Sequence, residues 1–368
     1  MNLKMFSLTV VLTMMGIVSM GQKILDSYHH YTGKIGNSID VTLDIVIAGN
    51  LAEGIYSYSN IQQPDNKKSI QITGRWDVVK KHFRLEEFGN PDGSTFILTK
   101  LENGLSGTWK PAEQDVELPC SLAENYNDGS LTFKTYSKAL SHTLFPMMKT
   151  SPRASYRIVI PEAIAGAQRN VLDSINKQVS LLYFNRLQEG EGFDNIIEAE
   201  RTRYFQQYVD QNLDNYTTTD QSNTFCWDKH LSLNVMHNEN DILSLGVKLY
   251  AFTGSGKGMI VKKYLTMSAK TGQRFSLNEL FDGDYKGQIE NLILNEVKVK
   301  FNLGQNELLT EKGFFAENVS VTENFYLTSN SIGFCYNPYE IAGASVGAIE
   351  IVIPISSIAS YLKPGIKL

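Results

Sequence analysis

Histidines are the residues best suited to metal binding or acid–base chemistry in this sequence. There are six of them: His29, His30, His82, His142, His230 and His237. Adjacent residues point to opposite sides of a strand, so His29 and His30 are poorly placed to share a ligand. His230 and His237 are too far apart to be close neighbours on one strand face. None stands with Cys or Asp at metal-motif spacing. The sequence therefore predicts no metal site and no cofactor.

The three cysteines, Cys120, Cys226 and Cys335, fit no zinc motif either. An exported chain can form disulfides, but three cysteines leave one unpaired. Burial as small hydrophobic side chains is the first interpretation. A bridge between Cys226 and Cys335, which both lie in strand-like segments, is the second. A catalytic thiol is the third, although no motif of His and carboxylate accompanies any of them.

A glycine-rich run, Gly254–Gly258, resembles a nucleotide-binding loop only superficially. A P-loop needs Gly five residues before its Gly-Lys pair and Ser or Thr after the Lys. Ala251 and Gly258 occupy those two positions. The run also joins two strand patterns, whereas phosphate cradles use a helix N-terminus. We predict no nucleotide site but a hairpin with left-handed glycines, whose tip residue Lys257 could contact an anionic ligand.

The Asn-Pro-Tyr-Glu motif at 337–340 leaves two interpretations open. In one, proline directs a turn, the tyrosine packs, and the glutamate holds the neighbouring backbone. In the other, Tyr336, Tyr339 and Glu340 form a rim that meets a ligand. Tyrosine suits such a rim because it offers contact area and a hydroxyl at low entropic cost.

Paired carboxylates are the remaining candidates for catalysis. Glu340 and Glu350 could act on a cell-wall glycan, since glycosidases need two carboxyl groups roughly 5 to 10 Å apart in a cleft. Glu198, Glu200 and Asp210 follow a helical pattern and are interpreted as its solvated face. No G-x-S-x-G motif indicates an α/β-hydrolase. We expect no catalytic residues, and keep a glycan-active enzyme as the alternative.

The first 21 residues have the pattern of a secretory signal peptide. Lys4 supplies a positive start, Met5–Val18 is uncharged and mostly apolar, and Ser19–Gly21 places small residues at a cleavage site. The apolar run is too short to cross roughly 30 Å of hydrocarbon as a helix. The sequence therefore predicts an exported protein, periplasmic or extracellular, without a membrane span after signal cleavage.

Composition supports a folded chain with two domains. The sequence has 368 residues, of which 42% are hydrophobic and 20% charged, so a packed core is expected. Its formal net charge of -5 shows no basic excess, so we predict no nucleic-acid partner.

Residues 28–125 have the pattern of an all-β module. Residues 39–47 alternate with period two, and strand patterns recur about every 10 to 14 residues with turn residues between them. This spacing predicts an antiparallel β meander or a small barrel. The stretch also resembles a small all-β module of exported bacterial proteins, on the motifs G-x-Y-x-Y at 54–58 and G-T-W at 107–109.

Three aromatic residues of this module leave two interpretations open. Tyr56, Tyr58 and Trp109 could fill the core or edge of the sheet, because large rings contribute most of their energy when buried. They could also form a stacking platform for a glycan or a peptide. We take the platform as a candidate binding site.

Residues 151–368 read as a second domain, after a connector at 126–150. Apolar residues at three- and four-residue steps predict helices near 164–183, 196–213 and 289–301, with Pro161 in the first turn of the first helix. Alternating segments between and after them predict strands. Because helical and strand patterns are segregated, the expected fold class is α+β with a mainly antiparallel sheet.

This second region resembles the extracytoplasmic domain of RsiV-type anti-sigma factors, a domain of unknown function that also occurs beside polysaccharide deacetylases. The matching motifs are Tyr250–Gly258, Thr271–Phe281, Phe334–Ala342 and Ile351–Pro354, within about residues 156–362. Lys257 replaces the loop histidine of the family, so no imidazole role carries over. In the anti-sigma factors the domain senses lysozyme, and the resemblance implies a protein or cell-wall partner.

Together these patterns predict an exported, non-enzymatic binding protein of the cell envelope. Its expected partner is an envelope or host protein, such as a lysozyme-like one, or peptidoglycan. A cell-wall glycan-active enzyme and a structural envelope protein are the alternatives.

Overall fold

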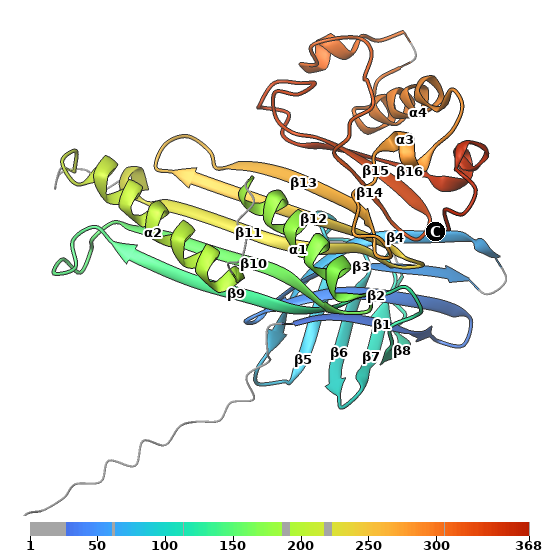
Figure 1. Ribbon diagram of the computed structural model, residues 1–368, viewed down its shortest axis with the longest axis horizontal. Coiled ribbons are helices and arrows are strands. Elements are labelled where there is room, and N and C mark those ends of the chain that lie inside the picture. Colours follow the sequence, from blue (N-terminus) through green and yellow to red (C-terminus); the bar gives the residue numbers. More distant parts are fainter. Residues whose placement is uncertain are drawn as a thin grey trace, which may run out of the picture.

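The computed structural model describes residues 27–60, 63–112, 114–185, 192–216, 223–304 and 306–367. The predicted signal peptide at 1–21 lies outside these ranges. The described strands form a thirteen-stranded sheet and a three-stranded sheet. Figure 1 shows the larger sheet continuing from a barrel, through a flatter part, toward the smaller sheet.

The first eight strands form a closed antiparallel barrel. They are β1 (Ser27–Ile35), β2 (Ile39–Ala48), β3 (Leu51–Asn60), β4 (Gln63–Asp77), β5 (His82–Glu87), β6 (Thr95–Leu101), β7 (Gly104–Lys110) and β8 (Leu118–Glu124). β1 pairs with β2 along its whole length and with β8 from Tyr31 to Ile35. This second pairing closes the barrel.

Period-two alternation decides which side chains fill the barrel. On β2, Leu43 and Ile45 belong to the barrel core, whereas Val46 packs outside it against the rest of the sheet. Interiors of eight-stranded barrels are just wide enough to be filled by side chains. Gly74 permits close strand approach, because a Cβ there would lie 1.9 Å from the Arg84 carbonyl oxygen.

Five further strands extend the same sheet: β9 (Thr132–Thr143), β10 (Arg153–Ala165), β11 (Trp227–Glu239), β12 (Ile242–Thr253) and β13 (Met259–Ser268). Their order from the free edge is β13-β12-β11-β10-β9, followed by β1. β10 and β11 are parallel, and the other pairs are antiparallel. Among the described residues, β9 joins the barrel through one residue pair, Ser27 with Lys134.

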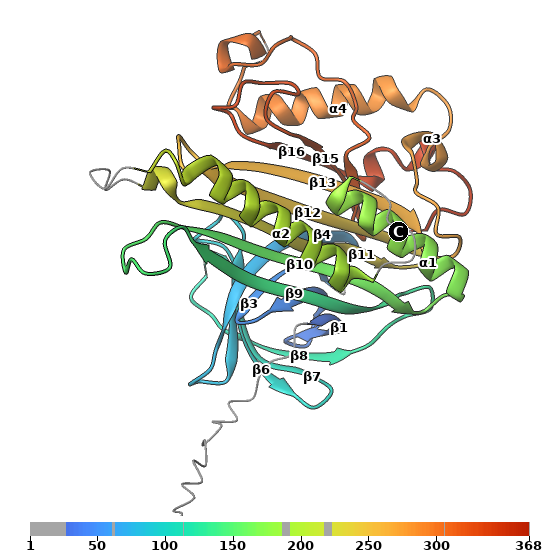
Figure 2. The same ribbon diagram turned by 60° about the vertical axis from the view of Figure 1, so that its left-hand side comes forward.

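Helices and the small sheet cover this extension. α1 (Arg169–Phe184) and α2 (Phe193–Asn212) pack on one face of β9–β13 (Figure 2). Their buried apolar residues join one core with Ile158, Leu245 and Leu265 of the strands. The remaining elements are α3 (Leu277–Leu280), α4 (Tyr285–Lys300), β14 (Phe325–Leu327), β15 (Ser331–Tyr336), β16 (Ile349–Pro354) and 3-10 turns at Asn223–Phe225, Leu309–Lys312, Ile355–Ser357 and Ala359–Tyr361.

The expected fold class, α+β with an N-terminal meander or small barrel, is wrong as a class, although the first eight strands do form a barrel. The fold is mostly β: a closed eight-stranded antiparallel barrel continues into five extra strands, and only α1, α2 and α4 are helices of several turns among the described residues. The sequence pattern separated strands from helices correctly in several places. It carried no sign that the second region continues the sheet of the first.

Two local expectations are also corrected. Residues 132–143, in the expected connector, form β9, which pairs with β10 along its whole length. Its second half is largely exposed, so it lacks the apolar alternation that marks a strand. Pro161 lies within β10, opposite Thr135, and not in a helix. α1 begins only at Arg169.

No helix in the described part of the chain is both long and apolar enough to cross a membrane.

Candidate ligand-binding site

A cleft lies between the outer wall of the barrel and one face of the sheet extension. The barrel contributes β2, β3, β4 and the residue after β5, and the extension contributes β10 to β13. Because α1 and α2 cover the opposite face, the face toward the barrel carries the alternate residues of each strand. We call this space the barrel–sheet cleft.

Strand register aligns polar residues on the sheet wall of the cleft. His230 on β11 lies opposite Arg157 on β10 and Tyr250 on β12. One step along, Ser232 lies opposite Lys248, which in turn lies opposite Lys262 on β13. Residues two apart on a strand share a face, so the two rows stand on the same surface.

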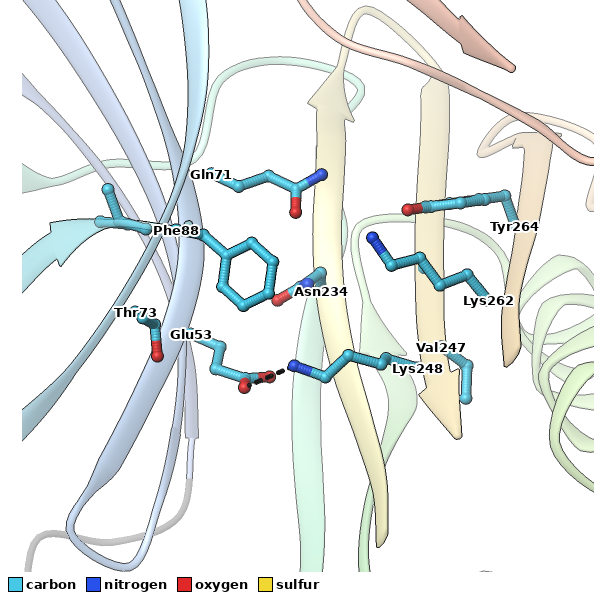
Figure 3. A pocket seen from close by; sticks show the side chains of 11 residues that line it. Glu53, Gln71, Thr73, Phe88, Asn234, Val247, Lys248, Lys262 and Tyr264 are labelled. Atoms are coloured by element: carbon cyan, nitrogen blue, oxygen red, sulfur yellow. Dashed lines mark hydrogen bonds and ion pairs between the residues drawn. The ribbon is translucent and has the colours of Figure 1, made fainter. Parts of the chain in front are cut away.

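The cleft contains two hollows that share Glu53 and Lys248. The larger has a volume of about 220 Å³, and Val46, Ala48 and Leu51 form its barrel wall. The smaller measures about 20 Å³, which is about the room that one water molecule needs. Figure 3 shows this smaller hollow, with the Phe88 ring pointing from the barrel side toward the two lysines.

Ion pairs hold the lysines of the cleft. Lys248 contacts Glu53 at 3.1 Å, across the two walls. Lys262 contacts Glu350 of β16, and the Tyr264 hydroxyl donates a hydrogen bond to the same carboxylate. Burial, followed by the charge of Glu350, raises the pKa of Tyr264 well above its usual value. The tyrosine therefore remains a hydrogen-bond donor at neutral pH.

Both ammonium groups also lie near one aromatic ring. The Nζ atoms of Lys248 and Lys262 are 5.1 and 5.8 Å from the centre of the Phe88 ring. Such cation–π contacts contribute about 0.5–1 kcal/mol at exposed sites. Phe88 is 50% exposed, so its ring forms the outer edge of the smaller hollow.

Several polar atoms of the cleft have no partner among the described residues. Glu53 Oε2, Ser232 Oγ and Asn234 Oδ1 are buried without a hydrogen bond. A buried unsatisfied group costs about 1–3 kcal/mol. Arg157 makes no ion pair or hydrogen bond within the described ranges and lines the larger hollow. Water or a ligand would satisfy these atoms, so the arrangement suits binding.

Two glycines make room for tyrosines of the sheet wall. A Cβ at Gly258 would lie 2.2 Å from the Tyr250 ring, and one at Gly246 would lie 2.6 Å from the Tyr264 ring. The glycine-rich run forms the loop between β12 and β13, with Gly254 and Gly256 at positive φ. Lys257 at this loop is exposed and does not line the cleft.

The expected aromatic platform lies inside the barrel. Tyr56 and Trp109 are buried in the barrel core, and Tyr58 is partly buried against it. The rings of Tyr56 and Tyr58 stack at 5.6 Å, and the Tyr56 hydroxyl donates to Glu87 at 2.9 Å. These three residues therefore pack with one another and offer no outer stacking surface.

The Asn-Pro-Tyr-Glu motif forms a turn that holds the edge of β13. The Asn337 side chain accepts a hydrogen bond from the Lys262 amide and donates one to its carbonyl, at 2.7 and 2.9 Å. Glu340 accepts a hydrogen bond from the Asn337 amide. Tyr336 is buried and donates to the Ser320 carbonyl. Tyr339 is 65% exposed, with a φ of +72°.

The proposed acid pair is engaged in two different contacts. Glu340 caps its own turn through the Asn337 amide. Glu350 lies on β16 and binds Lys262 and Tyr264. Across the described ranges, His, Cys, Asp and Glu residues form no group of three that could hold a metal ion.

All three cysteines are free thiols, so the suggested Cys226–Cys335 bridge is not formed. Cys226 directly precedes β11, at the end where Trp227 pairs with Thr253. Cys335 is on β15 and packs with Tyr264 and Tyr326. Burial, followed by the charge of Glu350, raises the pKa of Cys335 to about 12. Its thiol is therefore protonated at neutral pH.

Sequence reasoning missed the polar residues that line the cleft. Its strand patterns identified the apolar positions Leu231, Leu233 and Leu249, which lie on the helix-covered face. The residues between them, such as His230 and Lys248, are polar in three neighbouring strands. That recurrence was a usable signal for a second, polar face. Which part of the molecule lies opposite this polar face depends on where the barrel sits, and no local sequence pattern encodes that position.

One part of the chain is similar to a known family. Residues 278–356, from α3 to beyond β16, match the family described as "Protein of unknown function (DUF3298)". No curated protein matches the sequence significantly.

Solved structures of this family are similar to the chain. A DUF3298 family member from Bacteroides fragilis has a TM-score of 0.55 and 20% sequence identity, over 64% of this chain and 96% of its own. A second, from Pseudomonas aeruginosa PAO1, has a TM-score of 0.43 and 17% identity, over 64% of this chain and 97% of its own. The first likeness shows a shared fold.

Proposed function

We propose that this chain is an exported, non-enzymatic binding protein of the cell envelope, and that its ligand occupies the barrel–sheet cleft. The observation that carries the proposal is a set of polar groups in the cleft that have no partner within the described ranges: Glu53 Oε2, Ser232 Oγ, Asn234 Oδ1 and the guanidinium of Arg157. Concave sites with apolar walls and a few convergent polar groups are the usual form of ligand sites.

The chemistry of the cleft favours binding over catalysis. Its acidic residue Glu53 is paired with Lys248, and Glu350 beside it is paired with Lys262. A glycosidase needs one carboxyl as acid and another as base or nucleophile. Each of the two carboxylates is instead held in an ion pair with a lysine, and neither faces the other across a gap that a substrate could fill. We therefore expect recognition without turnover.

The identity of the partner rests on the sequence patterns. The predicted signal peptide supports export, and the resemblance to RsiV-type anti-sigma factors supports a protein or cell-wall partner. The likeness to DUF3298 structures adds a shared fold and no function.

A capture experiment with a blocked cleft tests the proposal. The purified chain is incubated with envelope proteins and with peptidoglycan, with lysozyme as one bait. Ala48→Trp places a large ring in the larger hollow, and Val79→Trp is the control because Val79 is 91% exposed on a barrel turn. We expect the unmodified chain and Val79→Trp to retain a ligand that Ala48→Trp loses.

Three outcomes would contradict the proposal. The first is equal capture by all three proteins, and the second is no capture by any of them. The third is hydrolysis of peptidoglycan that disappears in Glu340→Gln, which would support the enzyme alternative. Circular dichroism confirms that each variant is folded before binding is compared.

A further inference from the structure

We infer that the larger hollow of the cleft binds the terminal residue of a peptide, with the carboxylate on Arg157 and the side chain against the barrel wall. This inference rests on the proposed function and assigns a ligand class to the same site. It follows from the charge, the size and the hydrogen-bonding groups of the hollow.

The charge of the hollow matches one negative group. Glu53 and Lys248 neutralise each other at 3.1 Å. His230 is paired with Asp228 at 2.6 Å, so any charge on the imidazole has its own counter-ion. Arg157 remains as the unbalanced cation among the lining residues. A carboxylate brings a single negative charge, whereas a phosphate monoester brings about two at neutral pH.

The geometry of the cation also suits a carboxylate. A guanidinium group presents its N–H donors in a planar fork that matches the two oxygens of a carboxylate. Arg157 is half-buried on β10, opposite His230 on β11, which in turn lies opposite Tyr250 on β12. Partial burial strengthens such a pair, because the surroundings screen charge less than water does.

The size of the hollow limits how large a side chain can bind beside the carboxylate. Its volume is about 220 Å³, below the roughly 300–1,000 Å³ of sites that enclose drug-sized ligands. Val46, Ala48 and Leu51 make the opposite wall apolar. One apolar side chain of small or medium size fits this wall, and the rest of the peptide would leave through the open side.

A hydrogen-bonding group lies within the same hollow. Ser232 Oγ is buried and has no partner among the described residues. It can donate to a carboxylate oxygen or accept from the last peptide N–H group. A neutral sugar would satisfy the hydroxyl too, but it would leave Arg157 without a counter-ion. The terminal residue of a peptide satisfies both.

Fluorescence anisotropy with short labelled peptides tests this inference. The peptides end in Ala or Leu, each as L- and D-residue and each as free acid and C-terminal amide. We expect the free acids to bind at least ten-fold more tightly than their amides. A preference for D-residues would identify a cell-wall stem peptide as the source, and a preference for L-residues a protein C-terminus. Both support the inference.

Variants distinguish a specific contact between Arg157 and the peptide carboxylate from a general effect of positive charge. Arg157→Gln should weaken binding of the free acids at least ten-fold and leave the amides unchanged, with partial recovery in Arg157→Lys. Arg153→Gln is the matched control, because Arg153 is exposed on the same strand and lies outside the cleft. It should bind like the unmodified chain.

Equal binding of acids and amides, or equal loss in the Arg153 variant, would overturn the inference. So would inorganic phosphate that competes at lower concentration than acetate. If no peptide binds while Ala48→Trp still abolishes capture of an envelope ligand, the ligand class is wrong and the proposed function stands. If capture is insensitive to Ala48→Trp as well, both are wrong.

Discussion

Two parts of the interface between the barrel and the sheet extension differ in how completely their buried polar side chains are paired. In the first part, His30 on β1 is buried between two carboxylates, with its ring nitrogens 2.9 Å from Asp44 and 3.1 Å from Glu239. The Tyr28 hydroxyl donates to Asp44 at 2.6 Å, and Asn238 donates to the Tyr28 oxygen at 3.0 Å. We call these residues the His30 network.

The barrel–sheet cleft is the second part, and its polar groups are only partly paired. Glu53 contacts Lys248 through one oxygen, while its other oxygen, Ser232 Oγ and Asn234 Oδ1 have no partner in the described chain. Both parts join the same barrel wall to strand β11. The His30 network therefore holds the two walls together, whereas the cleft keeps polar groups that can still bind a ligand.

The largest effect should come from breaking the His30 network. Asp44→Ala removes the acceptor for both Tyr28 and His30 and leaves the imidazolium with half its counter-charge. Removing one partner of a buried ion pair costs about 3–5 kcal/mol. Urea unfolding followed by circular dichroism should show this loss in the free energy of unfolding. A loss below about 1 kcal/mol would remove the structural role assigned to the network.

The His30 network should also make stability depend on pH. Burial alone lowers the pKa of His30, but the charge and hydrogen bond of Asp44, then those of Glu239, outweigh it and raise the pKa from 6.5 to about 10. The folded state therefore binds the proton more tightly than the unfolded state. This contribution is complete below about pH 6.5 and is lost as the pH rises through about 10.

Unfolding in urea at several pH values measures this effect. Between pH 6.5 and 10 the free energy of unfolding should fall by up to about 1.4 kcal/mol per pH unit. The control is His30→Gln, which is less stable at neutral pH but should show a flatter slope. Equal slopes for the two proteins would show that another group is responsible.

The smallest effect on stability should come from the cleft. Glu53→Gln breaks a half-buried ion pair with Lys248, and we expect a change of about 1 kcal/mol or less in the free energy of unfolding. Ligand capture should change more clearly, because the freed Lys248 alters the charge of both hollows. Lys257→Ala, on the exposed β12–β13 loop, is the control and should change neither. A loss as large as that of Asp44→Ala would remove the contrast between the two parts.

The strands of the barrel could be predicted from the sequence, and its closure could not. Alternation located most of β2 and β5, because one face of each strand is buried. Closure depends on β1 pairing with β8, where Ile35 lies opposite Cys120. No periodic pattern encodes a partner so distant in the sequence. β9 was missed because its exposed half carries no apolar face.

The candidate site shows the same limit. Tyr56 and Trp109 have the residue types of a binding platform, but the curvature of the barrel turns them inward. The residues that line the cleft, such as Glu53 and Lys248, are of types common on any protein surface. They form a site only because the fold brings two strands that are distant in the sequence to face each other. Arg157 becomes informative only because, among the described residues, the fold gives it neither an ion pair nor a hydrogen bond.

The asparagines at the free edge of β13 have a consequence for self-association. Asn337 occupies the Lys262 amide and carbonyl, and Asn324 occupies the Tyr264 amide. Open strand edges recruit strands from other molecules and can seed fibrils. Here an incoming strand would have to displace two side chains that make the hydrogen bonds of a neighbouring strand. These asparagines therefore oppose edge-to-edge polymerisation.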